Sequence, residues 1–405
     1  MSNFDFTSVG LSNFMNTTGR ETGKTEEFFK LWVERCGKPS SLIFDTTSIS
    51  TYGNLLQAEW GYNRDGDSLP QVNFTLVSGR EQGLPLFYRL VPGSVPDVKL
   101  VQHTVMRLED FGMKNFKCAL DRGFYSAGNV RTLLEDKTGF VLGTPMSCNQ
   151  TRDLIKKHKA AMSSPKASIM FQGNVVRHAK DKWVVDMGKG EKMEIAAHVY
   201  MDPKRRADAV ASIERTVFEL ENKLSEEIAD GRVSNIFEGK EWINQKAGLL
   251  KGCLSVEQDA DGSIKVSRCV HTIATITGKK GHFVVITDDD NCSGEVVLAD
   301  YRSRDSIEKL FDILKNETEQ HRVRSGKEHV GAGRLFLAFI SMILHREMEN
   351  RLRLAKQLKN YTVSEVLSEM RKLKAVKTPA GRVLLMEITK RQRKLFAAMK
   401  MAEPV

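Results

Sequence analysis

The sequence lacks the features that would place it in, or across, a membrane. No stretch reaches the ~18 consecutive apolar residues that a transmembrane helix needs. Residues 1–24 are polar and rich in Ser, Thr and Asn, without the basic start and apolar core of a signal peptide. We therefore exclude a membrane protein and expect a cytoplasmic one.

Closely spaced cysteines are also absent. The six cysteines are scattered along the chain, at Cys36, Cys118, Cys148, Cys253, Cys269 and Cys292. Zinc sites and disulfide frameworks use short cysteine spacings, so the pattern argues against both and fits a reducing compartment. His329 and His345 have no Cys or His partner at ligand spacing, which favours structural or surface roles for them.

The positive charge is unevenly distributed. The 405 residues, enough for two or three domains or for one core with a large insertion, carry a net charge of +10. Residues 346–400 hold 15 Lys and Arg against 5 Asp and Glu, whereas the rest of the chain is balanced at 46 of each sign. A basic segment of this kind suits a phosphate backbone, and Arg391, Arg393 and Lys394 are candidate DNA contacts. The alternative is a helical tail that only faces solvent.

Two aspartates come directly after apolar, β-type runs. Asp45 follows Leu42-Ile43-Phe44, and Asp121 ends the run from Phe116. A half-buried carboxylate needs a partner or a metal, although either aspartate alone could be a turn or cap residue. Asp288, Asp289 and Asp290 are better explained as a polar turn, because successive side chains point in different directions.

The order of predicted elements indicates the fold class. We expect strands at 41–50, 70–77, 84–91, 116–121 and 139–146, and helices at 97–111, with Asp97 as its N-cap, and from Ser126 to 137. This β-β-β-α-β-α-β order is ribonuclease H-like: a mixed five-stranded α/β sheet flanked by helices. In that fold the first and fourth strands are neighbours, which would bring Asp45 and Asp121 together near the sheet's rim.

Residues 301–315 predict a helix with two adjacent faces. At about 100° per residue, Arg304, Glu308 and Lys315 fall within roughly 60° of Tyr301. A neighbouring arc is apolar and can pack on a core, through Ile307, Leu310, Phe311 and Leu314. The polar set can bind a metal through its carboxylate and phosphate through its other members. An ordinary amphipathic surface helix is the alternative.

The spacing Tyr-x2-Arg-x3-Glu-x6-Lys resembles the signature of bacterial insertion-sequence transposases of family 4, which use an Asp, Asp, Glu triad. The stretches Phe44–Ser48, Gly61–Asp65 and Asp121–Ser126 are also similar to motifs of that family. The resemblance covers about 40–146 and 280–400. The 187 positions that separate Asp121 from Glu308 fit a catalytic core with an insertion.

The predicted domain organisation follows from this resemblance. A β-rich insertion should precede the glutamate helix, with strands at 175–187, 193–200, 263–266 and 272–277 and a helix at 204–229. We expect a short N-terminal segment (1–40), a first core part (41–146), the insertion (147–281), a second core part (282–345) and a basic helical C-terminal segment (346–405).

The resemblance implies a DNA transposase that cuts and joins the ends of an insertion sequence. Asp45, Asp121 and Glu308 would bind two Mg²⁺ ions, with Mn²⁺ able to substitute, and would act on double-stranded DNA of the element ends and target. Tyr301, Arg304 and Lys315 would grip phosphates near the cut. A hairpin intermediate, a homodimer assembled on DNA and a bacterial, nucleoid-associated location are implied as well.

Two rival functions and two local questions stay open at this point. The chain could be a truncated or domesticated DNA-binding remnant without autonomous transposition, or a metal-dependent nuclease of the same fold. Only 44 residues precede Asp45, so we expect a shortened N-terminal DNA-binding region and weak preference for the element's own ends. Trp183 or Trp242 could stack an unpaired base, with core packing as the alternative for each.

Overall fold

The computed structural model describes residues 7–53, 55, 57–259, 262–377 and 383–404. The chain divides into two compact units. The first contains Met1–Leu142 and Asp300–Val405, and the second contains Gly143–Ala299. None of the helices in the described ranges combines the length and the apolar character needed to cross a membrane.

The first unit is built on a mixed sheet with the strand order β3-β2-β1-β4-β5. The strands are β1 (Ser41–Thr51), β2 (Gln71–Gly79), β3 (Pro85–Pro92), β4 (Lys117–Leu120) and β5 (Gly139–Thr144), the last of which begins in this unit. β1, β2 and β3 are antiparallel neighbours, whereas β4 runs parallel to both β1 and β5. The predicted mixed α/β sheet and its ribonuclease H-like order are confirmed.

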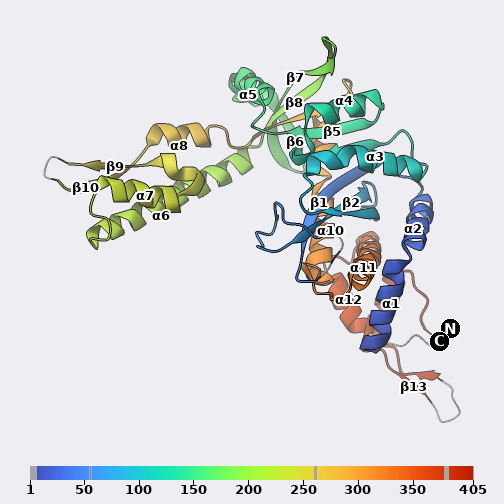
Figure 1. Cartoon of the computed structure of the whole chain (residues 1–405). Helices are drawn as coiled ribbons and strands as arrows, with labels where there is room; N and C mark the ends of the chain where they lie inside the picture. Colours follow the sequence, from blue (N-terminus) through green and yellow to red (C-terminus); the bar gives the residue numbers. More distant parts are fainter. Residues whose placement is uncertain (1–6, 54, 56, 260–261, 378–382, 405) are drawn as a thin grey trace. The chain divides into compact units, whose positions relative to one another are not determined.

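Helices cover this sheet and bury its strands. β2 is buried along its whole length, including its polar residues Gln71, Asn73, Thr75 and Ser78. α10 (Asp305–Asp312) packs on β1, and both α2 (Thr22–Arg35) and α11 (Glu328–Leu354) pack on β3. Figure 1 shows α3 (Leu100–Asp110) and α4 (Ala127–Glu135) on the side of the strands opposite α10 and α11.

The prediction of poor order for the first 24 residues is wrong for most of that stretch, because Ser8–Arg20 forms helix α1. Its sequence is polar, but α1 packs along α11 at very close range. A Cβ atom on Gly333 would lie only 1.9 Å from the Met15 carbonyl oxygen, and one on Gly19 would lie 1.9 Å from the His329 carbonyl oxygen. Close backbone contact at these glycines therefore holds α1 on α11, although α1 has no apolar face.

This close contact predicts the effect of a small substitution. Gly333→Ala should destabilise the chain by about 1–3 kcal/mol, because the added methyl group forces the two helix backbones apart. Denaturant unfolding measures the change. Gly23→Ala in α2 is the matched control, since its added methyl group meets open space and alanine is the better helix former. A Gly333→Ala protein as stable as wild type would contradict the packing argument.

The segment predicted as one helix over 301–315 is interrupted. α9 (Gly294–Arg302) ends just before Ser303 and Arg304, α10 follows, and residues Ile313–Glu317 form a π-helical turn. The ideal 100° spacing therefore fails beyond Asp312, because a π turn is wider than an α turn. Lys315 consequently leaves the common arc with Arg304 and Glu308 that regular helix geometry predicts.

The second unit has an antiparallel sheet and a separate helical core. Its strands run in the order β11 (His282–Thr287), β8 (Glu191–Met201), β7 (Asn174–Gly188) and β6 (Ser168–Phe171), and α5 (Asn149–Met162) packs on the sheet. α6 (Pro203–Ala229), α7 (Ile236–Lys246) and the β9–β10 hairpin (Leu254–Gln258 and Ile264–Arg268) share another core.

The expectation of a β-rich insertion is only partly met. The segment 147–281 carries α5, α6, α7 and α8 (Val270–Thr277) beside its strands. The predicted strand at 272–277 is wrong, because these residues lie in α8. Ile273 and Ile276, three positions apart, pack on the core of α6 and α7, and this spacing is helical.

The C-terminal segment adds helices α12 (Val363–Met370) and α13 (Lys390–Ala398). They pack with the end of α11 around a small core that contains Leu352, Val366 and Leu395. Both helices begin with a capping box, at Thr362 and Thr389. The predicted break near 378–381 lies outside the described residues.

Candidate active site

Asp45 lies in β1, and Asp121 directly follows β4, the strand that pairs in parallel with β1. β1 pairs with β4 from Ser41 opposite Lys117 to Ile43 opposite Ala119. The pairing ends there, and the same register continued by two residues would bring Asp45 opposite Asp121. Phe124 packs edge-on against Phe44, with 4.8 Å between ring centroids, and so holds the turn after Asp121 against the strand that carries Asp45.

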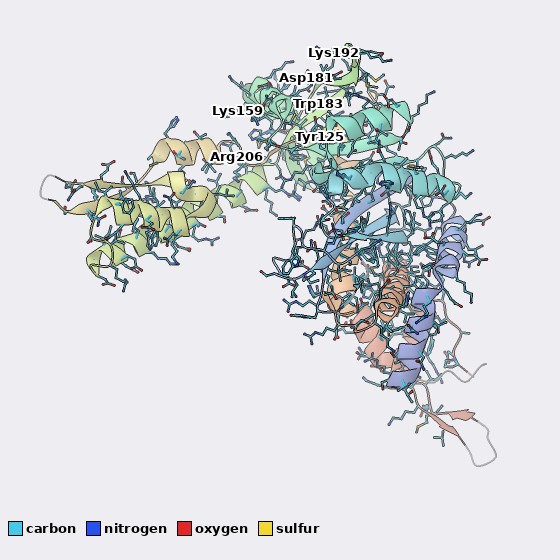
Figure 2. All side chains as sticks on the ribbon, viewed as in Figure 1. Tyr125, Lys159, Asp181, Trp183, Lys192 and Arg206 are labelled. Carbon is cyan, nitrogen blue, oxygen red and sulfur yellow. The ribbon has the colours of Figure 1, made fainter. Side chains whose placement is uncertain are left out.

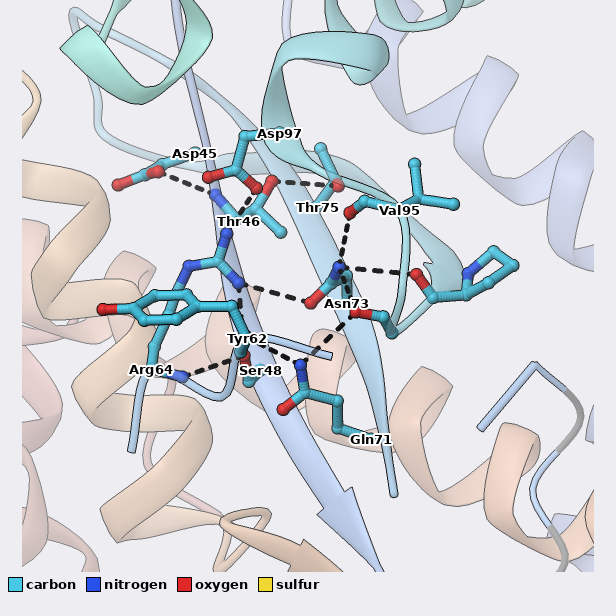
Figure 3. Close-up of polar contacts among 12 residues, drawn as sticks. Asp45, Thr46, Ser48, Tyr62, Arg64, Gln71, Asn73, Thr75, Val95 and Asp97 are labelled. Carbon is cyan, nitrogen blue, oxygen red and sulfur yellow. Dashed lines mark hydrogen bonds and ion pairs between the residues drawn. The ribbon is translucent and has the colours of Figure 1, made fainter. Parts of the chain in front are cut away.

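The environment of Asp45 resists a negative charge. Its Oδ1 accepts a 2.8 Å hydrogen bond from the Thr46 backbone N–H (Figure 3). Burial is the main cause that raises the pKa of Asp45 to about 7, and the charges of Asp121 and Asp97 act in the same direction. Thr46 and Arg304 oppose the shift. Two further carboxylates thus act on Asp45, an arrangement that a bound cation would stabilise.

Arg304 contacts Asp121 at the break between α9 and α10. Its Nη1 lies 2.9 Å from Asp121 Oδ1, and its guanidinium carbon lies 4.7 Å from the centre of the Tyr301 ring. The Tyr301 hydroxyl donates a 3.3 Å hydrogen bond to the same Oδ1. Two residues of the predicted signature therefore converge on the second predicted catalytic aspartate.

The groups around Arg304 favour its charged form. Burial opposes the charge of Arg304, but Tyr301, Asp121, Asp45 and Glu308 outweigh burial and raise its pKa. Only 13% of the Arg304 side chain is exposed. The three predicted triad residues thus share one arginine as their electrostatic neighbour.

Glu308 lies on the exposed face of α10, the helix that packs on β1. Its apolar neighbours Ile307, Leu310 and Phe311 are buried, as the sequence pattern predicts. In the described part of the chain, no three Asp, Glu, His or Cys residues are gathered closely enough to hold one metal ion. The structure therefore brings Asp45 and Asp121 together and places Glu308 beside their shared arginine, without forming a closed ligand set.

Lys315 does not join Tyr301 and Arg304 at Asp121. Its Nζ forms an ion pair with both carboxylate oxygens of Asp65, at 2.6 and 2.7 Å. Asp65 belongs to the stretch Gly61–Asp65, so two of the predicted motifs meet at this ion pair. The π-helical turn that carries Lys315 directs it to this partner.

Sequence reasoning missed Arg64 and Asp97. Asp97 was predicted as a helix N-cap, but the capping position belongs to Pro96, and the Asp97 carboxylate instead accepts from Arg64. Arg64 also donates to Ser48 Oγ at 3.1 Å and to Asn73 Oδ1 at 3.2 Å (Figure 3). The sequence does point to Arg64, because it lies in Gly61–Asp65, one of the stretches that resemble the family's motifs. Nothing in the sequence distinguishes Asp97, because an acidic residue at the start of a helix is common.

The comparison with protein-family models decides the family. The model described as "Transposase DDE domain" matches residues 37–344, which is most of the chain. The chain belongs to this family. The matched range contains Asp45, Asp121 and Glu308, and membership implies a phosphoryl-transfer enzyme that uses a divalent metal. The comparison with curated proteins found no match.

Among solved structures, the chain is similar to one described as a cryo-EM structure of the piggyBac transposase synaptic complex with hairpin DNA. The two share 10% sequence identity and align with a TM-score of 0.37. The alignment covers 91% of this chain and 59% of that one. At this TM-score the likeness carries no argument about the site of this DDE transposase family member.

The residues at the site fit a divalent cation by their chemistry. Asp45, Asp121 and Glu308 supply only carboxylate oxygens, which are the ligands that Mg²⁺ prefers. Asp45 is partly buried, and its raised pKa shows that the protein's own cations leave its charge incompletely compensated. Arg304 supplies the positive charge next to Asp121.

The other predicted contacts lie on α13, in the C-terminal segment. Arg391 stacks over the Tyr361 ring at 5.2 Å, and Arg393 pairs with Glu403 at 3.6 Å. Lys394 is exposed on α13.

The two candidate stacking residues lie in the second unit. Trp183 lies on β7 and is only 2% exposed, so it serves the core instead of presenting a stacking face (Figure 2). Trp242 is partly buried against the core of α6 and α7.

Proposed function

We propose that this chain is a DNA transposase that cleaves the ends of an insertion sequence and joins them to target DNA. The observation that carries the proposal is the convergence on Arg304. Asp45 comes from β1, Asp121 from the end of the adjacent strand β4 and Glu308 from α10, and all three act on the same guanidinium. Family membership supports phosphoryl transfer, and the signature at Tyr301 supports the insertion-sequence context.

Asp45, Asp121 and Glu308 would hold the divalent ions. When bound, such ions would activate the attacking oxygen and stabilise the leaving oxygen of an in-line displacement. Arg304 and Tyr301 present donors beside Asp121, where a scissile phosphate would approach, and we assign them to its non-bridging oxygens. One site can serve both hydrolysis and joining, because water and a freed 3′-hydroxyl differ only as the attacking oxygen.

Lys315 has a different role in this proposal. Its ion pair with Asp65 fixes the connection between β1 and β2 against the end of the glutamate helix. We propose that Lys315 keeps this pair in the free protein and contacts the DNA backbone beyond the cut when DNA is bound.

The decisive test is a cleavage assay on DNA that carries the element's ends, with Mg²⁺, scored separately for nicking and for joining. A transposase should do both. Nicking without joining would support a nuclease of the same fold, and binding without either would support a DNA-binding remnant. Omitting Mg²⁺ should abolish both reactions, and Mn²⁺ should restore them.

The basic C-terminal segment gives an independent prediction about binding. Reversing the charges of Arg391, Arg393 and Lys394 to Glu should weaken DNA binding and flatten the slope of log K against log salt. The slope should shrink by about 0.9 for each phosphate contact that is lost. Binding titrations of the triple variant over a range of salt concentrations measure both quantities.

A matched variant controls for net charge alone. Lys204, Arg205 and Lys223 lie on α6 in the second unit, and reversing them changes the total charge of the chain equally. Their reversal should leave the salt slope closer to that of wild type. If the two triple variants behave alike, α13 does not contact the phosphates.

A further inference from the structure

The connection between β1 and β2 presents aromatic side chains to solvent. Tyr52 is 57% exposed, Trp60 is 67% exposed and Tyr62 is 83% exposed. Large aromatic side chains are normally at least partly buried, because burial removes their apolar surface from water. Three exposed aromatics within eleven positions therefore call for an explanation beyond folding.

The exposure of these rings does not come from a loosely held loop. The backbone amides of Glu59 and Gln71 donate to each other's carbonyl oxygens, at 2.9 and 3.0 Å. Gln71 Nε2 also donates to the Tyr62 carbonyl oxygen at 2.8 Å, and Asn63 Nδ2 donates to Ser50 Oγ at 3.0 Å. Residues 59–63 are thus tied to β1 and β2, and this part of the connection gives Trp60 and Tyr62 a fixed support.

This support leads directly to the catalytic carboxylates. Arg64, two residues after Tyr62, donates to Asp97, whose charge acts on Asp45. In Figure 3 the Tyr62 ring and the Asp45 carboxylate extend toward the same side of the view. Tyr62 is thus linked through Arg64 and Asp97 to the surroundings of Asp45.

Two arginines lie next to the exposed aromatic residue Tyr52. Both Arg322 and Arg324 lie over the Tyr52 ring, with their guanidinium carbons 5.7 and 5.6 Å from its centre. Arg322 belongs to β12 (Arg322–Val323), which pairs in parallel with the end of β1. Arg322, Arg324 and Arg334 line a cavity of about 850 Å³ that also includes Lys315, the lysine of the signature.

Ion pairs set the charge of this cavity. Asp65 pairs with Lys315 and Asp67 pairs with Arg322, so these two carboxylates hold the basic side chains in fixed positions. Arg324 and Arg334 each add a positive charge to these pairs, and Glu319, which also lines the cavity, adds a negative one, so the lining stays net positive. A net positive cavity of this size, with Arg322 held by Asp67, fits a phosphate of a passing strand.

We propose that the aromatic residues Tyr52, Trp60 and Tyr62, together with Arg322 and Arg324, form a binding surface for unpaired nucleotides next to the cut. Bases stack on the rings of Trp60 and Tyr62, and the phosphates of the same strand contact the arginines. Aromatic stacking with basic side chains along the backbone is how proteins bind single strands. The inference rests on the proposed function and adds the form of DNA that the site prefers.

The test compares three DNA probes without divalent metal, so that binding is measured independently of cleavage. The probes are a single strand, a forked duplex and a blunt duplex of the same sequence, each followed by fluorescence anisotropy. Tyr62→Ala and Trp60→Ala should each lower affinity for the single strand and the fork by about 5- to 150-fold, the value of one stacked base. The affinity for blunt duplex should stay unchanged.

Two controls separate stacking from other effects. Tyr62→Phe keeps the ring and should retain wild-type affinity. Phe237→Ala removes an exposed aromatic from the second unit and should change nothing. A 2-aminopurine base at the fork junction should lose fluorescence on binding to wild type, and less so on binding to Tyr62→Ala.

The outcomes also distinguish this inference from the proposed function. Equal losses for the fork and the blunt duplex, or no loss at all, would overturn the stacking surface while leaving transposition untouched. If wild type binds none of the probes, both proposals fail. Self-association that disappears in Trp60→Ala, with no change in DNA binding, would instead identify the surface as a protein contact and overturn the inference.

Discussion

Asp45→Asn is expected to lower DNA cleavage by at least about 10³-fold, because it removes a carboxylate that we assign to the divalent ions. Metal ions supply several kcal/mol of transition-state stabilisation, and each 1.36 kcal/mol corresponds to about tenfold in rate. Asparagine has the same shape and can still accept the hydrogen bond from Thr46. Single-turnover cleavage of DNA that carries the element's ends measures the loss.

The same variant should be more stable than wild type in the absence of metal. In the folded chain the pKa of Asp45 is raised from 3.8 to about 7, chiefly by burial and further by Asp121 and Asp97. A raised carboxylate pKa destabilises the folded state above the unfolded pKa. The advantage of Asp45→Asn should therefore be small below pH 4, grow up to about pH 7 and then level off, at a few kcal/mol. Thermal unfolding in EDTA at several pH values measures it.

Opposite effects on activity and on stability characterise a functional carboxylate. A residue with only a structural role would lower both when replaced. Asp121→Asn and Glu308→Gln should lose cleavage to a similar degree while DNA binding persists. Asp312→Asn removes an exposed carboxylate from the same helix as Glu308 and should remain active. Cleavage at the wild-type rate in any one triad variant would remove that residue from the site.

The sequence predicts the central sheet, and from it the proximity of Asp45 and Asp121. β1 and β4 each carry an apolar run that ends at an aspartate, and the element order leaves few ways to arrange five strands. β1 and β4 are parallel neighbours, and each aspartate comes two residues after the paired residues Ile43 and Ala119. This equal spacing brings Asp45 and Asp121 together. This inference needs only strand pairing, which apolar patterning encodes.

The remaining geometry depends on contacts that patterning does not encode. Regular helix spacing cannot anticipate the break before Arg304 or the π turn at Lys315, because both depend on the partners that these side chains find. α1 is polar and is stabilised by close approach to Gly333. Asp97 looks like an ordinary helix cap, and only the structure shows it paired with Arg64. Local signals thus indicate which residues matter, and tertiary contacts decide how they meet.

Arg304→Gln is expected to reduce cleavage by about 10² to 10³-fold, the usual cost of losing one donor that stabilises developing charge. The guanidinium sits between Asp121, at 2.9 Å, and the face of the Tyr301 ring. In the proposed function it turns from the carboxylate to a phosphate oxygen. Arg304→Lys keeps the charge but not the planar fork, so it should recover only part of the lost rate.

Arg304→Gln should also change how the protein responds to metal. Without DNA or metal, the variant leaves Asp121 without its ion pair and should lose about 2 kcal/mol of stability. Added Mg²⁺ should then raise the unfolding temperature more than it does in wild type, because the ion supplies the positive charge that the arginine supplied. Thermal unfolding with and without Mg²⁺ measures this difference. Lys309→Gln, which removes an exposed charge from α10, is the control for net charge.

The two measurements on Arg304→Gln discriminate between two roles. A residue that contacts only DNA would reduce cleavage without altering the metal-free protein. A residue that only supports the fold would lower stability equally with and without Mg²⁺. Arg304 touches Asp121 directly, and its charge is favoured by Asp45 and Glu308. We therefore expect it to stabilise the carboxylates until metal binds, and a Mg²⁺ response identical to that of wild type would rule this out.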